Sequence, residues 1–169
     1  MLENILLWKE ITLGKYENGD AYRVALDTTH VLYDEEVVKI LASSEHTFVS
    51  NEQQVGLALV SYDDLFTEAE LFDSGSCDLI GRAKEKGLSL CATEVGPALR
   101  LTYLDQPEGE DICVMMEGLG EITKTPYGKE GLLFTLSNDG TNLNLKARTK
   151  HGYDHMLLFN DPLYIFQIK

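Results

Sequence analysis

Basic residues are scarce in this chain, which has 14 lysines and arginines against 28 aspartates and glutamates. The net charge of −14 repels nucleic-acid phosphates, so we expect no nucleic acid among the partners of the chain. A basic protein is the charged partner that this surface favours. Residues 40–81 contain no lysine or arginine but eight acidic residues. This acidic tract is either a solvated face or a partner-binding surface, with Asp63, Asp64, Glu68 and Glu70 as the candidate contacts.

Long hydrophobic runs are also lacking. No segment approaches the roughly 18 consecutive apolar residues that a membrane-spanning helix needs, so we expect no membrane association. The start of the sequence, MLENILLWKE, lacks the basic region and the long apolar stretch of a signal peptide. We therefore expect a cytoplasmic protein.

Cysteine is sparse and unpaired in its spacing. Cys77, Cys91 and Cys113 are odd in number and widely spaced, which fits neither a disulfide framework nor a zinc site. Cys91 and Cys113 have apolar neighbours, and we predict three buried, unbridged thiols.

Hydrophobic residues make up 44% of the 169 residues, and 8 tyrosines and 6 phenylalanines supply large side chains for a core. This composition predicts one globular domain spanning residues 1–169.

Helix signals are concentrated before residue 88. Asp34 has the character of an N-cap for a helix through Ser43, in which three apolar residues form the buried stripe: Val37, Ile40 and Leu41. A short helix or loop follows over 63–72. A further helix begins near Ser74 or Ser76 and ends at Gly87, a residue type favoured just after a helix.

Strand signals are strongest after residue 88. Residues 5–13 are interpreted as a short strand or an apolar entry segment. We predict a buried strand at 55–62 and a central strand at 163–168. Two hairpins are expected, one pairing 99–103 with 112–116 and one pairing 132–136 with 143–147. The predicted fold class is therefore α+β, with an antiparallel sheet in the C-terminal half and two or three helices mainly from the N-terminal half.

Polar side chains interrupt the apolar pattern between Gly87 and Gly118. The candidate acid, base and anion-binding residues there are Glu94, Arg100, Tyr103, Asp105 and Glu110. One interpretation is the site of a small hydrolase or a carbohydrate-binding enzyme, because paired carboxylates can divide acid and base roles. The other is a structural network in which Arg100 pairs with Glu94 or Glu117 across the sheet, and Asp105 and Gln106 cap the turn.

The same segment resembles a family of uncharacterised bacterial proteins that share a block like GLxLCPxExGPxLRLxYxDQPxGE, followed by a Met-Glu pair. The matching residues are Gly87, Leu88, Leu90, Cys91, Glu94, Gly96, Pro97, Leu99, Arg100, Leu101, Tyr103, Asp105, Gln106, Pro107, Gly109, Glu110, Met116 and Glu117. Ala92 stands where the block has proline, and Asp111 stands where it has an aromatic residue. The resemblance implies a bacterial origin and a shared fold, and it brings no activity with it.

Histidine spacing offers one candidate metal site. His151 and His155 are four residues apart with Asp154 beside them, although Gly152 disfavours a helix there and a surface loop is the alternative. We expect no cofactor. The leading functional hypothesis is a non-catalytic protein-binding domain, and the rival is the enzyme described above. A deep pocket lined by the polar residues favours the enzyme, whereas a packed hairpin with those side chains paired favours the binder.

Overall fold

The computed structural model describes residues 5–73, 78–117, 119–125, 128–149 and 163–169. The nine strands of this part form one curled, mixed sheet in the order β1-β3-β9-β5-β7-β8-β2, with β4 paired to β9 and β6 to β7. The strands are β1 (Lys9–Leu13), β2 (Leu32–Tyr33), β3 (Gln53–Val60), β4 (Leu88–Ser89), β5 (Asp111–Val114), β6 (Leu119–Thr125), β7 (Gly128–Asn138), β8 (Leu143–Thr149) and β9 (Leu163–Ile168). The helices are α1 (Gly19–Thr28), α2 (Glu35–Ala42), α3 (Tyr62–Leu65), α4 (Glu68–Asp73), α5 (Leu79–Glu85) and α6 (Val95–Thr102).

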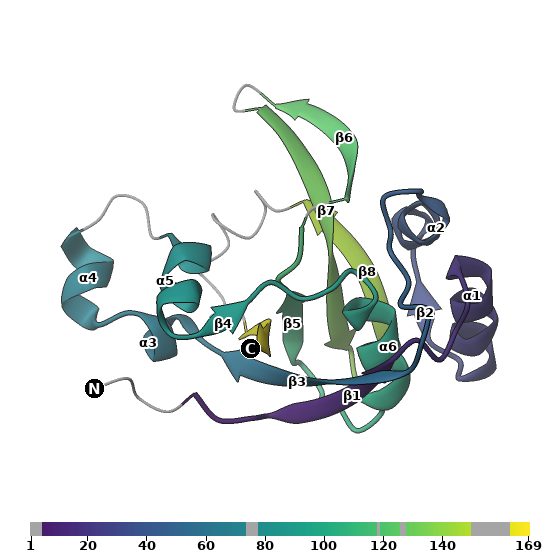
Figure 1. The fold of residues 1–169 in the computed structure, drawn as a ribbon, viewed down its shortest axis with the longest axis horizontal. Coiled ribbons are helices and arrows are strands. Elements are labelled where there is room, and N and C mark those ends of the chain that lie inside the picture. Colours follow the sequence, from purple (N-terminus) through teal and green to yellow (C-terminus); the bar gives the residue numbers. More distant parts are fainter. Residues whose placement is uncertain (1–4, 74–77, 118, 126–127, 150–162) are drawn as a thin grey trace.

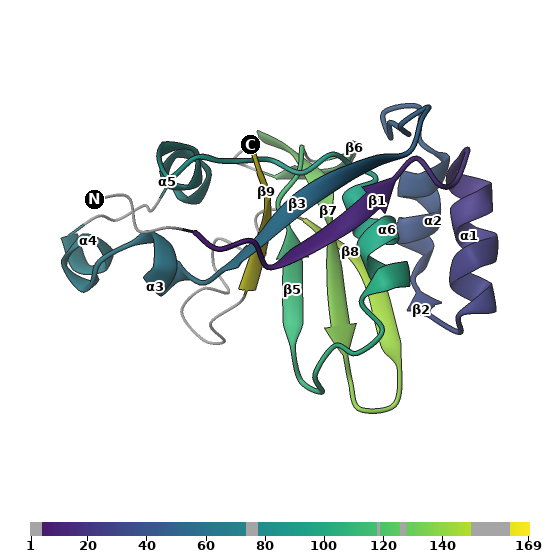
Figure 2. The same cartoon turned by 60° about the horizontal axis from the view of Figure 1, so that its bottom comes forward.

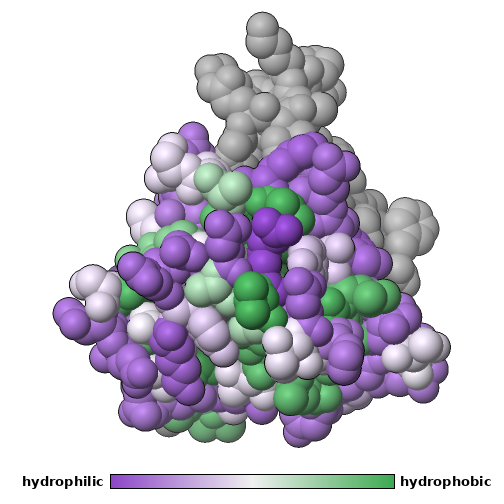
Figure 3. Space-filling model, turned by 90° about the vertical axis from the view of Figure 1, so that its right-hand side faces the viewer, coloured by the Kyte–Doolittle hydropathy of each residue, from purple (hydrophilic) through white to green (hydrophobic). Residues whose placement is uncertain are grey.

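The helices form two groups on either side of the sheet's centre (Figure 1). α6 packs on β1, β7 and β8, and α1 and α2 lie outside it. The short helices α3, α4 and α5 lie at the opposite end, beside the N-terminal segment (Figures 1 and 2). The face over α1 and α2 is mainly hydrophilic, with hydrophobic residues scattered between the polar ones (Figure 3). Across the described residues, no helix has the length and apolarity that a bilayer crossing requires.

The predicted central strand is confirmed. β9 lies between β3 and β5, and its residues Tyr164, Ile165 and Phe166 are buried. A strand that is apolar on both faces is most stable in the middle of a covered sheet, where both faces are shielded from water. The prediction of a hairpin at 132–147 is also correct, since β7 and β8 pair antiparallel around a turn in which Gly140 has a φ of 86°.

The α+β class is correct, but the sheet is not antiparallel. β5 runs parallel to β9 and β2 runs parallel to β8. The sheet also reaches into the N-terminal half, because β1 and β3 form one of its edges. Apolar alternation identifies a strand but says nothing of the direction of its neighbour, so the mixed topology has no signature in the pattern.

The predicted hairpin of 99–103 with 112–116 is wrong, because the first of these segments is the helix α6. Val95, Ala98 and Leu99 are spaced for one helix face, and this competes with the strand-like alternation of Leu99 and Leu101. Gly96 is required in this position, since a Cβ atom there would overlap the ring of Phe134. β5 pairs instead with β7 and β9.

The N-terminal helices match the prediction in part. Asp34 caps α2 by accepting a hydrogen bond from the Val37 amide at 2.9 Å, and Val37, Ile40 and Leu41 are buried as expected. α5 begins at Leu79 with Asp78 as its N-cap, whereas Ser74 and Ser76 lie outside the described residues. α1 was not predicted, and Asn18 is its N-cap.

Candidate functional site

Glu94 is fully buried at the start of α6 and binds three separate segments. Its Oε1 accepts hydrogen bonds from the Gly14 amide at 2.9 Å and the Tyr22 hydroxyl at 2.6 Å. Its Oε2 accepts one from the Val49 amide at 2.8 Å. Burial and the hydrogen bond to Glu94 raise the pKa of Tyr22, so the phenol remains a donor. The carboxylate therefore ties α6 to α1, to the loop between β1 and α1, and to the loop between α2 and β3.

His46 lies in the same buried cluster. It is 4% exposed, its ring centroid is 4.3 Å from that of Phe48, and both ring nitrogens lack a hydrogen-bond partner. Burial lowers the pKa of His46 to about 4, against a smaller opposing effect from Glu94. His46 is therefore a neutral, packed side chain at ordinary pH.

Arg100 lies near the other end of α6 and is also fully buried. Its guanidinium donates to Gln106 Oε1 at 2.5 Å and to the carbonyl of Tyr103. Burial lowers the pKa of Arg100 to about 10, which leaves it charged at neutral pH. The predicted pairing of Arg100 with Glu94 or Glu117 is wrong, because the arginine instead holds the chain that leaves α6.

Gln106 and Tyr103 complete this second network. Gln106 Nε2 donates to the carbonyls of Glu110 and Leu136, each at 3.2 Å, and the Tyr103 hydroxyl donates to Glu110 Oε2 at 2.9 Å. Asp105 is exposed. The segment between α6 and β5 is thus fixed to β7 by its own side chains.

The five candidate catalytic residues therefore do not form one constellation. Glu94 belongs to the network around α1, while Arg100, Tyr103 and Glu110 belong to the network that leads into β5. Asp105 faces solvent beside the second group. The polar residues that the sequence singled out are largely bonded to one another or to backbone.

A groove with a volume of about 520 Å³ lies elsewhere, beside the N-terminal segment. It is lined by residues 5–8, by Leu59 and Val60 at the end of β3, by Asp63 and Asp64 of α3 and by Lys86. None of the five candidate catalytic residues lines it. Leu6 and Leu7 are 78% and 56% exposed, respectively, although both are large apolar side chains. Exposed neighbouring leucines beside a groove are typical of a binding surface.

The N-terminal wall of this groove is held in place by aromatic contacts. The rings of Trp8 and Tyr103 meet edge to face with centroids 5.1 Å apart. The ammonium of Lys9 lies 4.6 Å from the centroid of the Tyr103 ring, where a cation is attracted to the ring face. The wall is thus anchored at Trp8, while Leu6 and Leu7 remain open to solvent.

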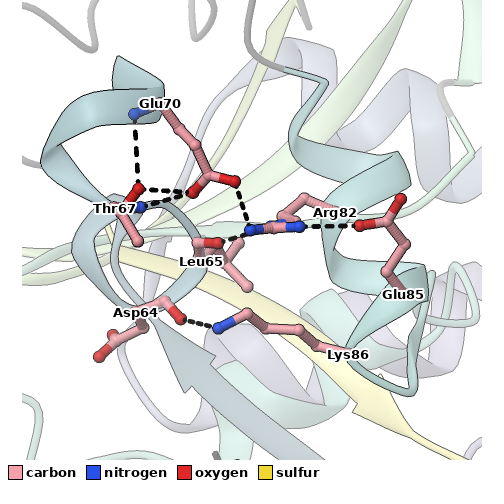
Figure 4. Close-up of polar contacts among 7 residues, drawn as sticks. All are labelled: Asp64, Leu65, Thr67, Glu70, Arg82, Glu85 and Lys86. Carbon is pink, nitrogen blue, oxygen red and sulfur yellow. Dashed lines mark hydrogen bonds and ion pairs between the residues drawn. The ribbon is translucent and has the colours of Figure 1, made fainter. Parts of the chain in front are cut away.

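Two basic side chains of the α5 region, Arg82 and Lys86, lie beside the acidic tract in the folded chain (Figure 4). They offset part of its negative charge. Arg82 Nη2 lies 2.6 Å from Glu70 Oε1, and Arg82 Nε donates to the Leu65 carbonyl at 2.9 Å. Lys86 Nζ donates to the Asp64 carbonyl at 2.7 Å. These contacts join α5 to the segment that contains α3 and α4.

The four predicted partner-binding acids divide into two pairs. Asp64 accepts from the amide and hydroxyl of Ser61 in a capping box, and Glu70 accepts from the amide and hydroxyl of Thr67. Asp63 and Glu68 are exposed, and within the described part of the chain they form no ion pair. Asp63 and Glu68 are therefore the acids of this set whose carboxylates remain available, and Asp63 lines the groove.

Cys91 and Cys113 are buried thiols, and burial raises the pKa of Cys91, which makes it a poor nucleophile. Cys77 and the proposed metal ligands His151, Asp154 and His155 lie outside the described residues. Among the residues that are described, no three histidine, cysteine or acidic side chains are grouped as metal ligands.

Comparison of the chain with protein-family models, curated proteins and solved structures found no match. Sequence reasoning missed Leu6 and Leu7, because residues 5–13 were interpreted as a short strand or an apolar entry segment, whereas β1 begins at Lys9. It missed Lys86 because this residue lies outside the acidic tract. The adjacent Leu6-Leu7 pair breaks the alternation of a half-buried strand, which was the available signal.

Proposed function

We propose that this chain is a non-catalytic protein-binding domain that takes up a basic partner at the groove beside its N-terminal segment. The observation that carries the proposal is the position of the exposed leucines Leu6 and Leu7 next to the available carboxylate of Asp63. Apolar side chains supply most of the free energy of such contacts, and the carboxylate selects the sign of the partner's charge.

The composition supports a basic partner. At a net charge of −14, the chain attracts cationic proteins at long range, and such attraction weakens with salt. The bonded state of Glu94, Arg100, Tyr103 and Glu110 accounts for the buried polar residues without a substrate. On the resemblance of 87–118 and the odd cysteine count, we further propose a bacterial, cytoplasmic setting.

A peptide-display selection tests this function. A random peptide library is selected against the wild-type chain, and the enriched peptides are then tested against Leu6→Ser/Leu7→Ser. We expect enrichment of peptides that combine apolar residues with lysine or arginine, and loss of their binding to the double variant. Val24→Ser is the matched control, because Val24 is 66% exposed on α1 at the far side of the molecule (Figure 1). Failure to enrich peptides, or enriched peptides that bind the double variant normally, would overturn the proposal.

A further inference from the structure

The groove contains an open strand edge. The pairing of β1 with β3 ends at Lys9 and Leu57, and residues 5–8 are not paired with β3 as strand residues. β3 continues for three residues to Val60, and these residues pair with β9 on the other side. Within the described residues, the part of β3 that lines the groove therefore has a strand neighbour on one side only.

The direction of the backbone groups at Leu59 follows from the hydrogen bonds on either side. The Leu57 carbonyl accepts from the Trp8 amide at 2.8 Å, so the backbone groups of Leu57 face the N-terminal segment. Leu59, two residues on, faces the same way. In agreement, Ile165 lies opposite Leu59 on β9, and its carbonyl accepts a hydrogen bond from the Met115 amide at 3.0 Å, on the side away from β3.

Leu59 therefore directs both its N–H and its C=O toward the groove. Among the backbone hydrogen bonds of the described residues, none between residues 5–8 and Leu59 closes this edge. The next residue with the same orientation, Ser61, already donates its amide to Asp64 Oδ2 at 2.6 Å. The open edge is thus one residue long, which is enough for a partner residue to exchange two hydrogen bonds with it.

We infer that the occupant of the groove is an extended peptide segment of a basic protein, which adds to β3 as a short strand at Leu59. This inference rests on the proposed function and specifies the partner. Two backbone hydrogen bonds at Leu59 fix the register, and apolar side chains of the segment pack on Leu6 and Leu7. A lysine or arginine of the segment pairs with Asp63. Strand addition of this kind combines backbone affinity with side-chain selectivity.

The charge around the edge supports a cationic segment. Two carboxylates, Asp63 and Asp64, line the groove against one ammonium, that of Lys86, and Asp63 is exposed and forms no ion pair in the described part of the chain. The exposed side chains of Leu6 and Leu7 are apolar, so they favour a segment with apolar side chains of its own over a bare cation.

The test uses a defined probe, the acetylated and amidated peptide Lys-Val-Lys-Val-Lys-Val, followed by NMR of the whole chain. At saturating probe, we expect amide hydrogen exchange at Leu59 to slow at least about ten-fold, as for an amide brought into a new hydrogen bond. Two further probes carry N-methyl groups on either the odd-numbered or the even-numbered amides. Because alternate residues of an added strand face β3, we expect one of these probes to bind about ten-fold more weakly and the other to bind almost like the unmethylated probe. The matched peptide with glutamate in place of lysine should not bind.

Three results would overturn the inference. Chemical-shift changes at Leu6 and Leu7, together with an unchanged rate of amide hydrogen exchange at Leu59, would mean that side chains dock without strand addition. This result would leave the proposed function standing. No binding of the lysine peptide, while display-selected peptides bind, would exclude a basic extended segment. A concentration-dependent dimer of the chain alone, abolished by Leu6→Ser/Leu7→Ser, would identify a second copy as the occupant.

Discussion

The side chain of Leu7 lies over Gly56 of β3, so that a Cβ atom built on Gly56 would stand 3.0 Å from Leu7 Cδ1. Leu7, which belongs to the N-terminal wall of the groove, thus packs over a residue of β3 that has no side chain. Ile168 lies on the same side, 3.9 Å from the same point. The placement of Leu7 therefore depends on glycine at position 56.

Gly56→Ala should alter the groove and spare the fold. The added methyl displaces Leu7, which is 56% exposed and can swing outward at little cost. We expect the free energy of unfolding to change by no more than about 0.5 kcal/mol. The affinity for the lysine–valine peptide should fall several-fold. Unchanged affinity would show that Leu7 is not part of the binding wall.

Arg100→Ala should destabilise the chain by about 1–3 kcal/mol, because it leaves Gln106 Oε1 and the Tyr103 carbonyl buried without their donor. Urea denaturation followed by circular dichroism measures the loss. Arg148→Ala is the control, since Arg148 makes a partly exposed ion pair with Asp111 and should matter less. An Arg100→Ala transition that coincides with wild type would contradict the structural role of Arg100.

Glu94→Gln should lose at least one of the three hydrogen bonds that the carboxylate accepts, since an amide nitrogen cannot accept from an N–H. We expect a loss of about 1–3 kcal/mol of stability. In a double-mutant cycle with Tyr22→Phe, the two changes should couple by about 0.5–3 kcal/mol because the groups are bonded to each other. Strict additivity would argue against this contact.

Stability should fall in acid partly through His46. Burial lowers the folded-state pKa of His46 to about 4, below the value of about 6.5 expected in the unfolded chain. The unfolded state therefore binds more protons, and stability falls as the pH drops from about 6.5 to about 4, by at most about 1.4 kcal/mol per pH unit.

His46→Phe should remove this part of the pH dependence, because phenylalanine does not titrate and neither ring nitrogen of His46 has a hydrogen bond to lose. Thermal melts of both proteins across this pH range make the comparison. His30→Asn, at an exposed residue with a φ of 56°, is the control and should melt like wild type. If the melting temperatures of wild type and His46→Phe fell by the same amount between pH 6.5 and pH 4, the predicted contribution of His46 to the pH dependence of stability would be contradicted.

Local rules predicted local structure well. The cap at Asp34, the stripe of α2 and the turn at Gly140 follow from interactions within a few residues, and all three are present. The segment 95–103 shows where such rules compete. Its alternating Leu99, Leu101 and Tyr103 favour a strand, but packing of Gly96 on Phe134 favours the helix, and that contact joins residues far apart in the chain.

The site was harder to predict for the same reason. Arg82 and Lys86 follow the acidic tract in the sequence, and only the fold of α5 brings them back to Glu70 and Asp64. The groove likewise joins residues 5–8 with Asp63 and Leu59, which no spacing rule connects. The sequence identifies the acidic side chains as candidates. It does not show which of their carboxylates are bonded within the fold and which remain available to a partner.

The most direct measurement is the fluorescence of Trp8, the one tryptophan of the sequence, which lines the groove. Titration with the lysine–valine peptide should give a saturable change in Trp8 emission, and its apparent Kd should rise with salt and in Asp63→Asn. Glu17→Gln, at an exposed acid outside the groove, should bind like wild type. An unchanged spectrum, or an equal response to the glutamate–valine peptide, would contradict the account of the groove as a binding site for basic protein segments.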